Sequence, residues 1–206
     1  MRTLALVLSL FLAAAARAQV EKRDRVYVSE AYGLRATAPD EGWIFYPETN
    51  ASPKARLHLT IFPRGTPGIP SVSVYVSDAD SAVDAPVDAT GARELAAKTL
   101  ETQGATDFER GVSKVAGREA PFFRAKMKNP LGGMLLVRCL ERVEHGYVYS
   151  FLCARAAEDE ASDAKLDAIL ASIELPEPKN AVESAETATW RGLAAKCADD
   201  LPWASS

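Results

Sequence analysis

The sequence has few of the residues on which catalytic and metal sites most often depend. Its 206 residues include two histidines and three cysteines. We interpret His58, on the polar side of an alternating segment, and His145, in a predicted hairpin turn, as surface residues. The sequence has no Gly-x-Ser-x-Gly elbow, no His-Glu-x-x-His motif and no phosphate-binding glycine loop. The cysteines and histidines also lack the short spacing typical of metal ligands, so we expect neither a metal nor a cofactor.

An excess of basic residues is also absent. The formal net charge is −4, and removal of residues 1–18 takes away Arg2 and Arg17 and changes it to −6. Phosphate binding requires a basic face, which this composition does not supply. We therefore expect no nucleic-acid partner.

The chain has no apolar run long enough to span a bilayer. The run from Leu4 to Ala15 is short, follows the basic Arg2 and precedes the small-x-small sequence 16–18. This pattern predicts a signal peptide over residues 1–18 and a mature chain that begins at Gln19. We expect an exported protein, periplasmic or secreted, without a transmembrane segment after cleavage.

The remaining chain divides into a domain, 19–175, and a linker with a helical tail, 176–206. A glycine at position 146 predicts a hairpin between two apolar strands within 133–156, and both strands carry apolar residues on both faces. Such strands belong in the middle of a sheet that is covered on both sides. After them, an apolar stripe at helical spacing predicts a helix over 162–174, which Pro176 ends. The stripe consists of Leu166, Ile169, Leu170 and Ile173.

Earlier segments alternate in the manner of half-buried strands. We expect strands or extended segments at 25–29, 32–37, 57–61, 71–78, 108–114 and 119–128. A helix with small apolar residues is predicted over 92–103, because Gly104 is a natural C′ residue. The order predicts an α+β fold in which helices flank one antiparallel sheet.

The three cysteines leave several pairings open, because an odd number in an exported protein leaves at least one thiol free. Cys139 and Cys153 are equidistant from Gly146, so a loop centred on that glycine would place them opposite each other. A tighter loop at His145-Gly146 would place them on opposite faces. A pair that includes Cys197, or buried free thiols, are the alternatives.

Two aromatic groups are candidate binding residues. Trp43, Phe45 and Tyr46 lie between Gly42 and Pro47, and they either plug one end of the core or form a platform for a ligand. In the tail, Trp190 lies on the apolar face of a predicted helix. We expect this helix to fold back onto the domain or to present Trp190 to a partner.

Four phrases in this order resemble the PsbP-like α/β/α sandwich superfamily and its exported bacterial relatives of unknown function. They are Tyr32-Gly33-Leu34 followed by Pro39 and Trp43, residues 115–120 (VAGREA), residues 146–149 (GYVY) and residues 169–173 (ILASI). The resemblance covers roughly Val26 to Leu175. It implies a docking or assembly module rather than an enzyme, and it transfers no catalytic residue.

The sequence therefore predicts an exported, non-catalytic binding or assembly module that docks a protein or an envelope component. The alternative is a hydrolase-like enzyme with an unrecognised carboxylate or thiol site. Glu119, Glu141 and Cys139 are the candidate residues for that alternative. A pocket with convergent polar groups would favour the enzyme, whereas a flat apolar patch would favour docking.

Overall fold

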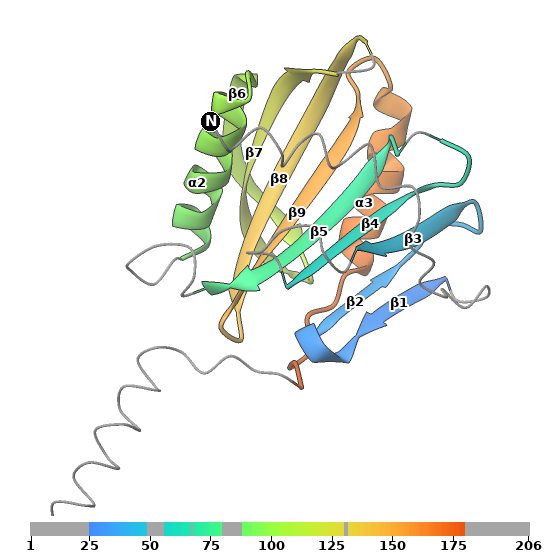
Figure 1. Ribbon diagram of the computed structural model, residues 1–206, viewed down its shortest axis with the longest axis vertical. Helices are drawn as coiled ribbons and strands as arrows, with labels where there is room; N and C mark the ends of the chain where they lie inside the picture. The colour runs from blue at the N-terminus through green and yellow to red at the C-terminus, as the bar shows by residue number, and fades with distance from the viewer. Residues whose placement is uncertain (1–24, 49–55, 67, 80–87, 130–131, 180–206) are drawn as a thin grey trace, which may run out of the picture.

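The computed structural model describes residues 25–48, 56–66, 68–79, 88–129 and 132–179. These residues form an antiparallel seven-stranded sheet, a separate two-stranded sheet and two α-helices (Figure 1). The predicted α+β class, a sheet with helices on it, is confirmed. Among the described residues no helix is long and apolar enough to cross a membrane.

The large sheet has the strand order β3-β4-β5-β9-β8-β7-β6. Its strands are β3 (Trp43–Glu48), β4 (Leu57–Pro63), β5 (Ser71–Asp78), β6 (Thr106–Val115), β7 (Arg118–Lys128), β8 (Met134–Glu144) and β9 (Tyr147–Ala156). The hairpin of β8 and β9 occupies the centre, as its apolar residues on both faces predicted. A sequence-distant strand, β5, is the other neighbour of β9.

The two α-helices cover opposite faces of this sheet. Helix α3 (Asp163–Ser172) buries Leu166, Ile169 and Leu170 in the larger core, which also holds the apolar side of β4, β5 and β9. Helix α2 (Ala89–Thr102) packs on β7 and β8 with small side chains and closes a second core around Phe123. The predicted apolar stripe of α3 is confirmed. On α2 the buried residues are Ala92 and Ala97, whereas Leu95, expected on the buried face, is 46% exposed.

The small sheet of β1 (Val26–Ser29) and β2 (Leu34–Thr37) adds to the core on the α3 side. Helix α3 was predicted to run to Glu174 but ends at Ser172. The reason is that Glu174 pairs with Arg35 of β2 through backbone hydrogen bonds of 3.0 and 2.9 Å. The described chain then continues to Lys179, whose N–H donates to the carbonyl of Glu30 at 2.8 Å. The segment 176–179, predicted to begin the linker, therefore lies against the domain.

Both long hairpins turn through two residues in the left-handed region. In the β8–β9 loop, φ is +55° at His145 and +78° at Gly146. In the β6–β7 loop, φ is +51° at Ala116 and +72° at Gly117. Two-residue loops of this kind match the twist of the flanking strands. They determine which side chains of each strand share a face.

Candidate functional site

Four side chains form a polar row across the α2 side of the large sheet. Strand register places His58 opposite Tyr75, Tyr75 opposite Ser150, and Ser150 opposite Glu141. The row arises because β4 and β5 alternate, so that their apolar residues point toward α3 and their polar residues point toward the other face. Among the described residues, α2 is the helix on this face, and it packs on β7 and β8.

Glu141 is the most buried charged residue of the described chain, with 1% of its surface exposed. Its carboxylate accepts hydrogen bonds from Ser150 Oγ at 2.7 Å and from Cys139 Sγ at 3.2 Å. Burial raises the pKa of Glu141 from 4.5 to about 7, and the two hydrogen bonds oppose this rise in part. The site can therefore gain or lose a proton near neutral pH.

Cys139 is a donor to Glu141 and not an activated nucleophile. Burial, together with the neighbouring carboxylate, holds the pKa of its thiol well above the ordinary value. The thiolate is the reactive form of cysteine, and this site disfavours it. The pair consequently lacks the reactive thiolate that a thiol hydrolase requires. Two of the three predicted enzyme candidates, Cys139 and Glu141, do lie together.

Glu119, the third candidate, forms no hydrogen bond with Glu141 or Cys139 among the described residues. It is exposed, and the register places it opposite Lys114 near the β6–β7 turn. The residue that does complete the cluster, Ser150, was not singled out from the sequence. Ser150 lies on β9, nine residues after Glu141, and the two-residue hairpin loop is what places these two residues opposite each other.

His58 is buried, with 3% of its surface exposed, and the prediction of a surface histidine is wrong. Its ring stacks on Tyr75 with centroids 4.2 Å apart and planes 13° apart. Its Nε2 lies 3.2 Å from Thr60 Oγ1, which in turn lies 3.2 Å from Ser73 Oγ. Hydroxyl and imidazole groups thus form a hydrogen-bonded cluster beside the row. His145 is exposed in its turn, as predicted.

The predicted aromatic platform is divided between the two faces of β3. Trp43 and Phe45 are buried in the core on the α3 side, which agrees with the alternative that they plug the core. Tyr46 pairs with Thr60 and therefore shares the face of the polar row. Trp190 lies outside the described residues. Ligand binding by Tyr46 or Trp190 stays a prediction.

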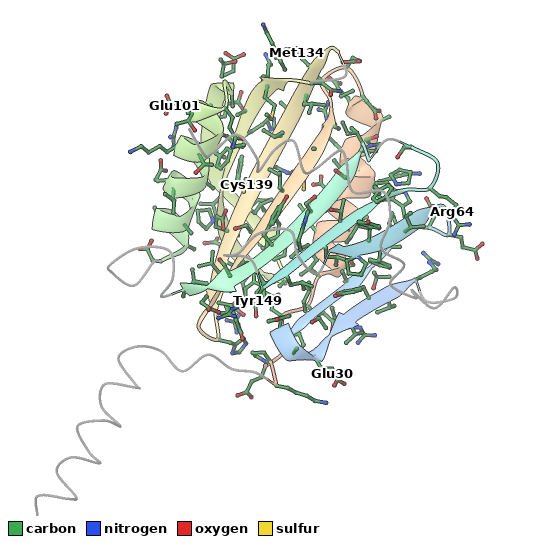
Figure 2. The ribbon with its side chains drawn as sticks, viewed as in Figure 1. Glu30, Arg64, Glu101, Met134, Cys139 and Tyr149 are labelled. Carbon is green, nitrogen blue, oxygen red and sulfur yellow. The ribbon has the colours of Figure 1, made fainter. Side chains whose placement is uncertain are left out.

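The bridge between Cys139 and Cys153 is ruled out by the register. Cys139 lies opposite Leu152, whereas Cys153 lies opposite Arg138, so the two thiols are on different faces of the sheet. Both are free and buried. The physical reason is the tight His145-Gly146 loop, because a shift of one residue moves every side chain to the other face. Figure 2 shows Cys139 in the middle part of the sheet.

The described part of the chain contains no group of three or more histidine, cysteine, aspartate and glutamate side chains placed to hold a metal ion. Two acidic residues that precede α2 in the chain interact with groups of the protein itself. Asp78 forms an ion pair with Arg56 at 2.7 Å, and Asp88 accepts a hydrogen bond from the N–H of Gly91 at 2.7 Å as the N-cap of α2.

No protein-family model matches the chain, and no curated protein matches it. Similar solved structures include cyanobacterial PsbP (CyanoP) from Synechocystis sp. PCC 6803, at a TM-score of 0.48 and 15% identity over 78% of this chain and 98% of that chain. LpqN of Mycobacterium tuberculosis, described as involved in cell envelope biogenesis, has a TM-score of 0.46 and 11% identity over 69% and 83% of the two chains.

A protein from Bacteroides thetaiotaomicron has a TM-score of 0.47 and 10% identity over 74% of this chain. The present chain spans about half, 48%, of the length of that structure.

Proposed function

We propose that the protein is an exported binding module without catalytic activity, and that the polar face formed by β4, β5 and β9 docks a protein partner. The polar row and its flanking hydroxyl groups carry this proposal. Thr60 and Tyr75 are half-buried on a face where neighbouring side chains can donate or accept hydrogen bonds. Tyrosine is a frequent anchor of protein interfaces because it combines an apolar ring with a polar end.

The chemistry of the same face argues against catalysis. Its thiol is held in the protonated form, and both oxygens of Glu141 are engaged by Ser150 and Cys139. Arg93 and Arg110 are both paired with Glu94, and Arg118 is paired with Glu144, which argues against a nucleic acid as partner.

Export rests on the first 18 residues of the sequence. We expect N-terminal sequencing of the protein recovered outside the cytoplasm to begin at Gln19. Recovery of a soluble form that retains Met1 would contradict this expectation.

Photo-crosslinking tests the docking proposal. A photoreactive amino acid at Thr60 should give one discrete protein adduct in intact cells of the source organism, and the same group at Thr106, exposed on the edge strand β6, should not. The variant Tyr75→Ala should bind the identified partner at least tenfold more weakly. Arg118→Ala, changed at an exposed site away from β4 and β5, should bind normally.

Equal adducts from Thr60 and Thr106 would overturn the proposal. An adduct that contains glycan or lipid but no protein would also overturn it, in favour of an envelope polymer. Turnover of a substrate that is lost in Glu141→Gln would establish the enzyme alternative.

A further inference from the structure

Three arginines gather on the α3 side of the sheet, the face opposite the polar row. Arg124 of β7 lies directly across from Arg138 of β8, and Arg155 of β9 lies across from Leu136, two residues before Arg138. Together they line a cavity of about 10 Å³, whose other lining residues are Leu136, Cys153, Asp163 and Leu166. Like charges directly opposite each other on adjacent strands destabilise a sheet unless a counter-charge lies between them.

One of the three arginines has hydrogen-bond partners within the protein at all three of its guanidinium nitrogen atoms. Arg155 has 6% of its surface exposed, and its Nε and Nη2 donate to the two oxygens of Asp163 at 2.7 and 2.9 Å. Its Nη1 donates to the carbonyls of Ala156 and Ala157 at 3.0 and 2.9 Å. Arg155 therefore forms a fixed wall of the cavity and ties β9 to α3.

The other two arginines keep donors in reserve. Arg138 uses Nη2 for an ion pair with Asp167 of α3, and its guanidinium group also hydrogen-bonds the Cys153 thiol. Arg124 lies 3.8 Å from the carboxylate of Glu109, beyond hydrogen-bond distance, and its side chain is 41% exposed. The thiol of Cys153 does not neutralise them, because burial raises its pKa to about 11 and keeps it uncharged at neutral pH. Of these two arginines, Arg124 is thus the less closely paired with an acid.

We propose that Arg124 and Arg138 form a binding site for an oxyanion, a phosphate or sulfate group that inserts one oxygen into the cavity. The cavity has room for about one water-sized atom, which fits a single oxygen and leaves the rest of the group at the surface. The half-buried side chain of Arg124 forms the accessible rim. The planar guanidinium group presents its donors in a fork that matches oxyanions, and an anion between the two arginines would relieve their repulsion.

Isothermal titration calorimetry with sodium sulfate and sodium phosphate tests the site, with chloride adjusted to hold the ionic strength constant. Both anions should bind the full-length protein with saturation. Arg124→Gln should bind at least tenfold more weakly, and it leaves the ion pairs of Arg138 and Arg155 in place. Arg118→Gln, the matched control, removes the same charge at an exposed site elsewhere and should bind like the wild type.

The source of the phosphate group is distinguished by a second series. Glycerol 1-phosphate that binds at least as tightly as inorganic phosphate indicates a lipid headgroup, and vesicles of phosphatidylglycerol should then retain the protein in an Arg124-dependent manner. Weaker binding of the ester indicates free phosphate. Absence of saturable binding, or equal affinities of wild type and Arg124→Gln, would overturn the proposal.

Discussion

At the scale of single residues, Glu141 is the buried acid of the polar face, and burial disfavours its charged form. A carboxylate out of contact with water is disfavoured unless it is well hydrogen-bonded. Here two neutral donors, Ser150 and Cys139, replace the ion pair that usually accompanies a buried acid. The group therefore holds its proton over part of the pH range in which other glutamates are ionised.

This arrangement predicts a pH-dependent effect of Glu141→Gln. Between about 4.5 and about 7 the folded protein binds more protons at Glu141 than the unfolded chain does, so the wild type loses stability as the pH rises through this window. We expect Glu141→Gln to be more stable than the wild type by about 1 to 3 kcal/mol at pH 8, with the advantage shrinking toward pH 5. Urea denaturation from pH 5 to pH 8 measures it.

Glu119→Gln is the matched control, because Glu119 is exposed and the same substitution there should leave the pH dependence of unfolding unchanged. An advantage of Glu141→Gln that is constant across this pH range would show that the carboxyl does not titrate within the window.

Gly33 combines a left-handed backbone conformation with a close contact to the backbone of Pro176. Its φ is +56°, and a Cβ at this position would lie 2.1 Å from the carbonyl oxygen of Pro176. We expect Gly33→Ala to lower the free energy of unfolding by at least about 2 kcal/mol. Alanine is strained in the left-handed conformation, and its Cβ would displace the segment at Pro176. Gly65→Ala, at φ +79° with open space around it, should cost only about 1 kcal/mol. Equal losses in chemical denaturation would contradict the contact.

At the scale of elements, α3 is held to the sheet by both apolar and charged groups. Ile169 is fully buried, and the pairs of Arg138 with Asp167 and of Arg155 with Asp163 join the helix to β8 and β9. The apolar contacts carry most of the energy, because the carboxylates of both ion pairs are exposed to solvent, which weakens each pair.

Ile169→Ala should therefore lower the free energy of unfolding by about 2 to 5 kcal/mol, the range for emptying a buried aliphatic site. Lys165→Ala, at an exposed position of the same helix, should change it by less than about 0.5 kcal/mol. A loss below about 0.5 kcal/mol for Ile169→Ala would mean that α3 is not docked through this residue.

At the scale of the whole molecule, the last described residues are held against the domain by hydrogen bonds and packing. Lys179 bonds to Glu30 through its backbone N–H and its side chain, and Pro176 closes on Gly33. Lys179 thus lies beside the small sheet of β1 and β2, at the lower edge of the domain in Figure 1.

The predicted apolar face of the tail, which includes Trp190 and Leu193, favours folding back onto the domain, because an isolated helix of this length is marginally stable in water. Truncation after Lys179 should lower the melting temperature by several degrees and leave the contacts of Lys179 intact. Trp190→Ser in the full chain should reproduce most of the loss. An unchanged melting temperature in both would indicate that the tail is free.

The sequence by itself determined the local elements of this protein. Alternation in β4 and β5, the apolar stripe of α3 and the glycines at 104, 117 and 146 act between residues close in the chain, so their effects can be predicted without a structure. The central place of the β8–β9 hairpin followed from the same pattern, because strands that are apolar on both faces require cover on both sides.

Only the tertiary structure decided which of these elements are neighbours. The polar row exists because β5 pairs with β9, across some seventy residues of chain, and no local period encodes that pairing. The arginine cavity likewise needs the register of β7, β8 and β9. The cysteines show the limit most sharply, since one residue more or less in the loop at His145 decides whether Cys139 and Cys153 face each other or opposite sides of the sheet.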